Sequence, residues 1–222
     1  MPYFKNHNIN LLLIHIPKTG GTSLESYFSN KYSIELSNHT LYYFASDEYK
    51  KDINNNLLYH VFLFRNVSLQ HFTYNNIIKN NHILNVDFND LTIITVVRNP
   101  YDRLISDLFF FNLIDVTSTR EHVYNVIKNY IYYNFLDNHN IPQYMFLIDD
   151  TDNIISNIKI MKTETLMNDM AKLGYTDFNV KENENKNKIT NYDIYLNDDS
   201  VVLINKFYEK DFIYFNYDMK QI

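Results

Sequence analysis

The chain has 222 residues, of which 45% are hydrophobic and 16% aromatic, so it can bury a core and is not a disordered protein. Its formal net charge of −6 argues against a general nucleic-acid-binding protein, because that function needs clustered lysine and arginine. Cysteine is absent, which excludes disulfides, thiolate metal sites and cysteine nucleophiles. Any anion-binding site must therefore be local.

The chain shows no internal repeat and no linker, so residues 1–222 are predicted to form a single domain. The apolar run at 11–16 is too short for a signal peptide or a membrane span. We therefore expect a cytoplasmic protein, cellular or virus-encoded.

Strands and helices are predicted to alternate along the chain, because short β-branched runs are followed by apolar residues at helical spacing. In chain order, the predicted elements are a strand at 11–16, a helix at 22–29, a strand at 57–64, a short helix after Thr73, a strand at 91–97, a helix from Pro100 to about Asn112, a long helix at 119–136, a strand at 157–161, a helix after Thr163 and a terminal helix at 199–215.

Several residues suit the ends of these helices. Thr73, Asn99 and Thr163 can act as N-caps, and Gly174 can end the helix that follows Thr163. The terminal helix is amphipathic, and its residues expected to point inward are Val202, Phe207, Phe212 and Phe215.

Alternating strands and helices predict an α/β fold, a three-layer sandwich in which helices flank a mostly parallel central sheet. In such sheets ligands bind beyond the carboxyl ends of the strands. Two unusual loops are expected at that edge, at residues 17–23 and 98–106.

The first loop, PKTGGTS, carries residues suited to a phosphate or sulfate group: Lys18, Thr19, Gly20, Gly21, Thr22 and Ser23. A helix N-terminus favours an anion, glycines allow close approach, lysine adds a charge and hydroxyls donate hydrogen bonds. The residue order does not match the Walker A pattern, in which lysine follows the second glycine. The alternative is a tight turn in which Ser23 only caps the helix.

The second loop, RNPYDRLIS, places Arg98 after a predicted strand and Ser106 on nearly the same face of the following helix. A guanidinium offers a planar fork to a phosphate group. The chain has only four arginines, and Arg103 is the second in this segment. We predict a structural role for Arg103, paired with Asp102 or Asp107 on a solvated helix.

Together, IHIPKTGGTSLESYF at 14–28 and RNPYDRLIS at 98–106 resemble two motifs of the sulfotransferases that use 3′-phosphoadenosine 5′-phosphosulfate (PAPS). The resemblance is to the branch that contains heparan sulfate 2-O and 6-O sulfotransferases and bacterial relatives. It implies a P-loop-like fold and a 5′-phosphosulfate held by the first loop. It also implies a 3′-phosphate held by Arg98 and Ser106, and an acceptor hydroxyl on a carbohydrate; a tyrosine or small-molecule acceptor stays open.

Three later segments extend the resemblance. IPQYMFL at 141–147 is similar to a Pro-Gln segment of these enzymes, residues 158–174 to a strand and helix, and FYEKDFIYFNY at 207–217 to their closing helix. Asn216 stands where the family commonly has glycine, which leaves the local turn geometry in doubt.

Sulfuryl transfer to a hydroxyl needs a base for the acceptor proton and positive charge near the leaving oxygen, which Lys18 can supply. His71 is the predicted base, because it lies in a loop between the two anion-binding motifs and QHFT resembles a QHLT-like element of bacterial relatives. His71 could instead cap or pack a helix, and His139 is the second candidate. His15 is expected to be a satisfied core residue. No histidine pair has metal-ligand spacing, so no metal is expected.

Two other interpretations remain open. Lys186 and Lys188 could belong to a mobile loop over the nucleotide or to a solvated loop. The chain as a whole could be a P-loop-like nucleotide or small-molecule kinase, although Walker A order and a magnesium-binding carboxylate are not evident. It could also be a nucleotide-binding protein without catalysis.

Overall fold

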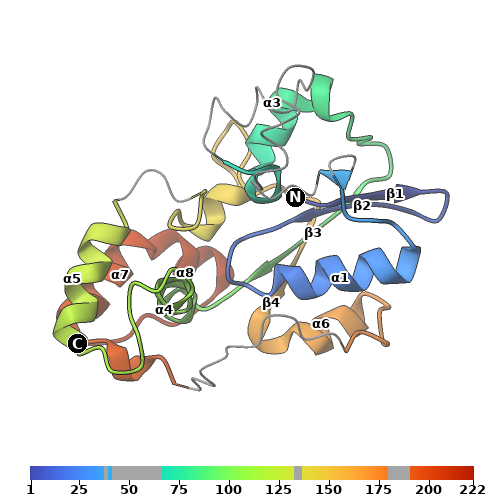
Figure 1. The fold of residues 1–222 in the computed structure, drawn as a ribbon. Coiled ribbons are helices and arrows are strands. Elements are labelled where there is room, and N and C mark those ends of the chain that lie inside the picture. Colours follow the sequence, from blue (N-terminus) through green and yellow to red (C-terminus); the bar gives the residue numbers. More distant parts are fainter. Residues whose placement is uncertain (38–39, 42–66, 133–136, 180–190) are drawn as a thin grey trace, which may run out of the picture.

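The protein forms an α/β sandwich around a four-stranded sheet, seen in a computed structural model that describes residues 1–37, 40–41, 67–132, 137–179 and 191–222 (Figure 1). The strands, in their order across the sheet, are β1 (Tyr3–Asn6), β2 (Ile9–Ile14), β3 (Thr92–Val97) and β4 (Ile158–Lys162). β1 and β2 form an antiparallel hairpin, whereas β2, β3 and β4 are parallel. The strand predicted at 57–64 lies outside the described residues.

Seven α-helices and four short 3-10 helices complete the described part of the chain. The α-helices are α1 (Gly21–Tyr32), α3 (Tyr74–Leu84), α4 (Pro100–Phe110), α5 (Arg120–Tyr130), α6 (Leu166–Lys172), α7 (Asp198–Phe207) and α8 (Glu209–Phe215). The 3-10 helices are η3 (Leu69–His71), η4 (Gln143–Phe146), η5 (Thr163–Thr165) and η6 (Asp193–Tyr195). None of these helices is long and apolar enough to cross a membrane.

Alternating residues of the strands pack on opposite faces of the sheet. On β2, Leu12 and Ile14 belong to the core under α3, while Leu11 and Leu13 belong to the core under α1 and α6. Figure 1 shows α3 on one side of the sheet and α1 with α6 on the other. This pattern follows from the period of two along a strand, and it confirms the predicted three-layer α/β sandwich with a mostly parallel sheet.

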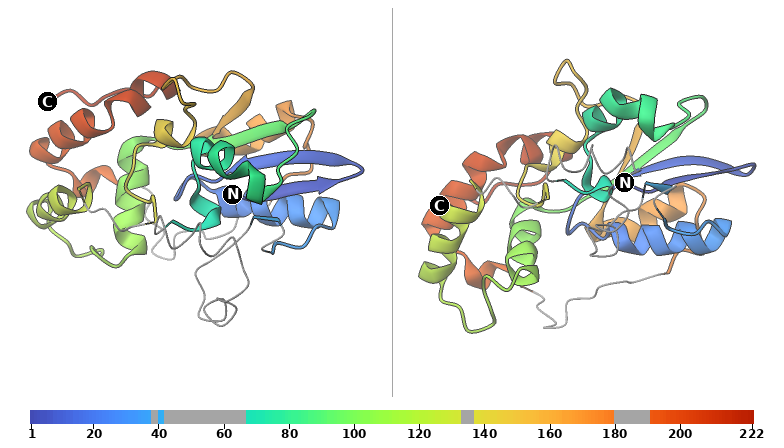
Figure 2. Two further views of the ribbon diagram at one scale, coloured as in Figure 1. Left: turned by 90° about the horizontal axis from the view of Figure 1, so that it is seen from above. Right: turned by 45° about the horizontal axis from the view of Figure 1, so that its top comes forward.

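The remaining helices form a second cluster beside the sheet. α4, α5, α7 and α8 pack around a core of their own, with members such as Tyr101, Leu108, Val123, Ile204 and Phe212. The three views agree that this helical part lies beside the sandwich, next to the end of β3 from which α4 leaves (Figures 1 and 2). The predicted site therefore lies where the two parts meet.

Most predicted helix ends are confirmed. Thr73 and Asn99 accept hydrogen bonds from the first turns of α3 and α4, and Pro100 is the first residue of α4. Gly174 follows α6 at φ 92°, the left-handed conformation that glycine adopts without strain. Asn216 ends α8 at φ 52°, so asparagine adopts the left-handed conformation in the turn whose geometry the resemblance left in doubt.

Three predictions about helices were wrong. Thr163 does not cap α6, which begins at Leu166, and its hydroxyl bonds two backbone carbonyls instead. The terminal helix is broken at Tyr208 into α7 and α8, and Val202 is 49% exposed because the neighbouring Val201 faces the core. The long helix predicted at 119–136 ends at Tyr130, and residues 133–136 lie outside the described part of the chain.

Candidate active site

The glycine loop, residues 15–21, connects β2 to α1. Two of its residues, Lys18 and Gly20, have positive φ angles of 65° and 92°, which turn the chain sharply into the helix. Gly20 is the N-cap, and no side chain caps α1. The N–H of Ser23 donates to the carbonyl of Gly20 at 3.1 Å, and the positive end of the dipole of this 12-residue helix faces the loop.

Three hydroxyls were predicted to line this loop, and they lie in different surroundings. Thr19 is fully buried, and its hydroxyl donates to the carbonyl of Ile16 at 2.8 Å, which braces the loop. Thr22 is half-buried and Ser23 is buried, both within the first turn of α1. Thr22 and Ser23 are therefore the hydroxyls at the helix start, whereas the Thr19 hydroxyl is already used in a hydrogen bond within the loop.

The second glycine of the pair is required by a histidine. A Cβ on Gly21 would lie 2.6 Å from Cδ2 of His15 and 2.7 Å from its Nε2, closer than real contacts allow. The His15 ring thus packs directly against the start of α1. Nδ1 of His15 is hydrogen-bonded to Oε1 of Glu25, and Gln70 donates to both oxygens of that carboxylate at 3.0 and 3.1 Å. The prediction of a satisfied core role for His15 is confirmed.

Arg98 follows β3 and reaches across to the glycine loop. Its Nη1 donates to the carbonyl oxygen of Lys18 at 3.2 Å, and its guanidinium lies 5.3 Å from the ring centre of Tyr192. Ser106 lies half-buried on α4, the helix that begins two residues after Arg98. The hydroxyl of Thr163 donates to Thr19 and Val97 carbonyls, at 2.6 and 3.1 Å, and so links the glycine loop to the end of β3.

The ammonium group of Lys18 lies over the aromatic ring of Phe110. Its Nζ is 4.2 Å from the ring centre of Phe110, a cation–π contact at a side chain that is 53% exposed. Burial lowers the pKa of Lys18; the negative charge of Asp107 opposes this shift, and the positive charge of Arg98 adds to it. Lys18 and Arg98 place two positive charges near one loop, although the chain as a whole has a net charge of −6. This local positive charge favours the binding of an anion.

His71 ends η3 and is paired with a carboxylate from a distant part of the chain. Its Nδ1 lies 2.7 Å from Oδ2 of Asp137, which also accepts from the hydroxyl of Ser68 at 2.8 Å. Burial lowers the pKa of His71 to about 4, although the bond to Asp137 opposes the shift. Among the described residues Nε2 has no hydrogen-bond partner. This lowered pKa favours the uncharged imidazole near neutral pH, with Nδ1 held by Asp137.

His139 forms a third pair of this kind and contacts the second. Its Nδ1 lies 2.8 Å from Oδ1 of Asp107, whose other oxygen accepts from the hydroxyl of Tyr130. The rings of His71 and His139 meet edge to face at 4.9 Å, and those of His15 and His71 at 5.3 Å. Three imidazoles thus form a row. Phe110 stacks on His139 at 5.7 Å, which brings the Lys18 ammonium to one end of that row.

Arg103 is buried and was predicted to pair with Asp102 or Asp107; that prediction was wrong. Its guanidinium donates to three backbone carbonyls, those of Pro17 at 3.0 Å, His139 at 2.6 Å and Ile141 at 2.9 Å. The structural role itself is confirmed. Arg103 joins the glycine loop to the loop of His139, so it fixes the distance between the two halves of the site.

The sequence did not reveal the partners of these residues. Glu25, Gln70, Asp107, Asp137 and Gln143 were not assigned to the site. The role of Asp107 could have been recognised from the sequence. It lies one turn after Arg103 on a helix with many apolar positions, and a carboxylate buried there needs a hydrogen-bond partner. No sequence pattern indicated the role of Asp137, because only the fold brings it to His71.

Metal binding is the other chemistry that this cluster could support. His71, Asp137 and His139 each offer one ligand atom, and these atoms lie within 4.8 Å of one another, the one such group of three found among the described residues. Both imidazoles already share a hydrogen bond with a carboxylate, a pairing that also orients a histidine for proton transfer. The geometry of the cluster therefore suits either proton transfer or metal binding.

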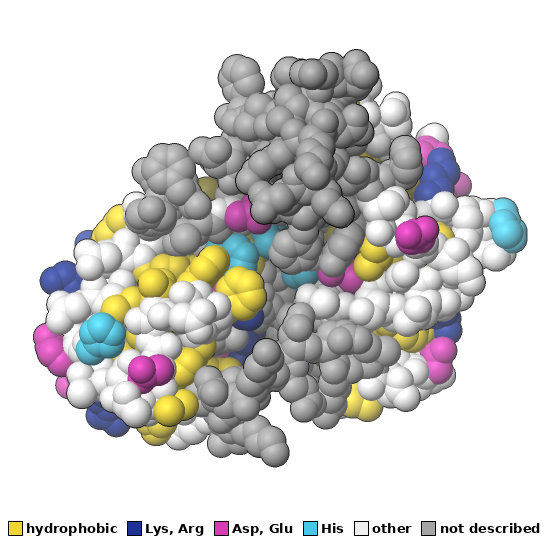
Figure 3. Space-filling view, viewed as in Figure 1, with side chains coloured by type: hydrophobic (Ala, Val, Ile, Leu, Met, Phe, Trp, Pro, Cys, Tyr) yellow, Lys and Arg dark blue, Asp and Glu magenta, His cyan; other side chains and the backbone are white. Residues whose placement is uncertain are grey.

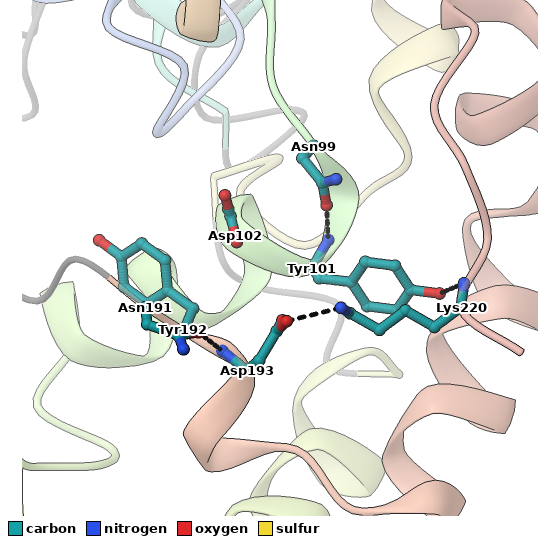
Figure 4. A pocket seen from close by; sticks show the side chains of 7 residues that line it. All are labelled: Asn99, Tyr101, Asp102, Asn191, Tyr192, Asp193 and Lys220. Atoms are coloured by element: carbon teal, nitrogen blue, oxygen red, sulfur yellow. Dashed lines mark hydrogen bonds and ion pairs between the residues drawn. The ribbon is translucent and has the colours of Figure 1, made fainter. Parts of the chain in front are cut away.

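The face of the molecule that carries the site is seen in Figure 3. Histidine side chains gather at the centre of the face in Figure 3, between the sheet and the helical part and beside residues that are not described. A separate polar pocket of about 260 Å³ lies at the start of α4 (Figure 4). Its lining residues are Asn99, Tyr101, Asp102, Asn191, Tyr192, Asp193 and Lys220. This pocket shares Tyr192 with Arg98 but contains none of the histidines.

A family model described as "Sulfotransferase family" matches residues 1–143, a segment that contains the glycine loop, Arg98, His71 and His139. Neither the comparison with curated proteins nor the comparison with solved structures found a match.

Proposed function

The chain belongs to the sulfotransferase family, and on that premise we propose that it transfers a sulfuryl group from PAPS to a hydroxyl group of a carbohydrate. Sulfotransferases have a P-loop-like fold, and the α/β sheet described above is of that class. The observation that carries the proposal is the meeting of three parts: Arg98 at the end of β3 bonds the glycine loop at Lys18, and the His71–Asp137 pair contacts the same loop through the His15 ring.

The groups present fit the two charged ends of the donor. The N–H groups at the start of α1, Lys18, Thr22 and Ser23 would hold the 5′-phosphosulfate. Arg98 and Ser106 would hold the 3′-phosphate, because they lie at the adjacent strand end and on the helix that follows it. Burial is the main cause of the lowered pKa of Lys18 and the positive charge of Arg98 adds to it; a bound dianion would offset the repulsion between these two cations.

His71 is the proposed base. With Nδ1 donating to Asp137, Nε2 can accept the proton of the acceptor hydroxyl, and Asp137 then stabilises the imidazolium. The acceptor oxygen forms a bond to sulfur while the bond between sulfur and the 5′-phosphate oxygen breaks. The leaving oxygen takes the electron pair, and the Lys18 ammonium offsets its charge. His139 has a comparable pair with Asp107 and remains the alternative base.

The carbohydrate acceptor rests on the likeness of the two loop motifs to heparan sulfate sulfotransferases. One feature of the site is compatible with it: Phe110 presents an exposed aromatic face next to His139 and Lys18. An aromatic face can pack against the apolar side of a sugar ring, and equally against a phenol. An acceptor library that contains both classes, analysed by mass spectrometry for the gain of one sulfuryl group, distinguishes them.

Donor binding separates this proposal from a kinase. Calorimetry should show that 3′,5′-adenosine bisphosphate, the desulfated product, binds more tightly than ATP with Mg²⁺ and raises the melting temperature. The physical reason is that the site offers cationic groups at both strand ends. Tighter binding of ATP would contradict the proposal and favour phosphoryl transfer.

Replacement of His71 separates catalysis from simple nucleotide binding. His71→Ala should lower turnover by about 10²–10⁴-fold and leave affinity for the bisphosphate nearly unchanged. Lys18→Ala should weaken donor binding as well as turnover. His82→Ala is the matched control, since His82 is exposed on α3. A folded His71→Ala protein with near-normal turnover would transfer the base assignment to His139.

A further inference from the structure

The backbone of Arg98 is held by a buried amide. Oε1 of Gln143 accepts from the N–H of Arg98 at 2.9 Å, and Nε2 of the same side chain donates to the Arg98 carbonyl at 2.8 Å. Gln143 is fully buried. The two bonds are those that a neighbouring strand would make, so the amide extends the hydrogen bonding of β3 by one residue beyond its end.

A second buried residue holds Gln143 in turn. The Asp211 side chain, on α8, is fully buried, and its Oδ2 accepts from the backbone N–H of Gln143 at 2.8 Å and from Nε2 at 3.4 Å. Its other oxygen accepts from the N–H of Tyr144 at 2.8 Å. A carboxylate from the last helix therefore caps the start of η4 and orients the amide that grips Arg98.

These bonds form a chain from α8 through η4 to the residue at the end of β3. We propose that Gln143 and Asp211 are positioning residues, which aim the Arg98 guanidinium at the 3′-phosphate of the donor and so set the preference for 3′-phosphorylated nucleotides. This inference rests on the proposed function, since it needs Arg98 to contact that phosphate. The guanidinium has a fixed planar geometry, and a change in its backbone angle would misalign its donors.

The test compares affinities for 3′,5′-adenosine bisphosphate and adenosine 5′-phosphate, which differ by the 3′-phosphate. The wild-type protein should prefer the bisphosphate, and Arg98→Ala should remove about 10-fold or more of that preference. Gln143→Leu should lower the preference at least threefold although Arg98 is intact. In the double variant, Gln143→Leu should cause no further loss, because it acts through Arg98.

Asn81 supplies the matched control. From α3, its side chain makes the same two hydrogen bonds to the backbone of Val86, at 2.8 and 3.1 Å. Val86 lies in the segment that leads into the start of β3, whereas Arg98 follows the end of that strand. Asn81→Leu should therefore reduce stability without changing the nucleotide preference. Asp211→Asn, which keeps the size of the side chain, tests the same proposal if Gln143→Leu does not fold.

The outcomes are distinct. Equal weakening of both nucleotides in Gln143→Leu, or an unchanged preference in a folded Gln143→Leu and a folded Asp211→Asn, would overturn the positioning role. A wild-type protein that shows no preference for the bisphosphate would overturn the proposed function itself, before any variant is made.

Discussion

Two of the three histidine–carboxylate pairs in the row, His15–Glu25 and His71–Asp137, differ in their access to solvent. In the first, His15 and Glu25 are both buried, the Glu25 side chain is 1% exposed, and Gln70 covers both of its oxygens. In the second, His71 is buried but the Asp137 side chain is 36% exposed. The two imidazole rings are only 5.3 Å apart.

This difference in solvent access indicates that the two pairs have different roles. Burial alone would raise the pKa of Glu25, but the charge and hydrogen bonds of His15 and Gln70 lower it, so the carboxylate is an ionised and closed part of the fold. His71 keeps one nitrogen without a partner among the described residues, beside a carboxylate that reaches solvent. The same residue types therefore build a closed support in one place and, in the other, a more open pair that contains the proposed base.

Breaking the first pair should have the largest effect. Glu25→Ala would leave His15 and Gln70 buried without their acceptor, and the expected loss is about 3–5 kcal/mol in the free energy of unfolding. The start of α1 rests on the His15 ring, so affinity for 3′,5′-adenosine bisphosphate should fall as well. Urea denaturation and calorimetry measure the two quantities.

Glu35→Ala is the control for this variant, because Glu35 is exposed shortly after α1. Its stability should stay within about 0.5 kcal/mol of the wild type. If Glu25→Ala were as stable as Glu35→Ala, the support role of the first pair would be wrong.

Titration of His71, in the second pair, should make the free energy of unfolding depend on pH. His71 has a pKa of about 4 in the folded protein against about 6.5 in an unfolded chain. Between these values the unfolded chain binds a proton that the folded protein does not, so stability rises with pH and is lost as pH falls. The loss contributed by His71 between pH 6.5 and pH 4 is up to about 3 kcal/mol.

The measurement is the difference in unfolding free energy between the wild type and His71→Gln across that pH range. The difference should shrink as pH falls, because the variant lacks the titrating imidazole. His82→Gln, at an exposed position on α3, is the control for replacing a histidine by glutamine. Parallel curves for His71→Gln and the wild type would show that His71 titrates normally.

Local patterns in the sequence predicted much of this site. Asn99 and Pro100 begin α4, Thr73 caps α3, and the glycine loop connects a strand to a helix, because each of these features depends on residues within one turn of the chain. The helix ends that failed did so where tertiary contacts compete: Thr163 gives its hydroxyl to the carbonyls of two other segments.

Local sequence patterns could not predict which residues pair with one another in the site. Asp137 is 66 residues from His71, and Asp211 is 68 residues from Gln143. A sequence shows that a buried carboxylate needs donors but not which donors the fold brings to it. Arg103 illustrates this, since its nearby carboxylates were plausible partners and backbone carbonyls from two loops were the actual ones.

The smallest of the three effects tests how the first pair supports the glycine loop. Gly21 is the first residue of α1, where alanine would otherwise favour the helix by up to about 1 kcal/mol. The added Cβ would meet the His15 ring at 2.6 Å, and overpacking of this kind costs about 1–3 kcal/mol. Gly21→Ala should therefore be destabilised in thermal unfolding and should bind the bisphosphate more weakly.

A second change isolates the cause of this effect. In His15→Ala the ring is absent, so adding Gly21→Ala to that background should cost little or even stabilise, and the two substitutions should be strongly non-additive. Gly174→Ala provides the contrast: no atom lies within 4 Å of its Cβ position, and its cost should come from φ 92° alone and persist in either background. A Gly21→Ala protein more stable than the wild type would mean that the His15 ring does not rest against α1, and the first pair would then lose its link to the anion-binding loop.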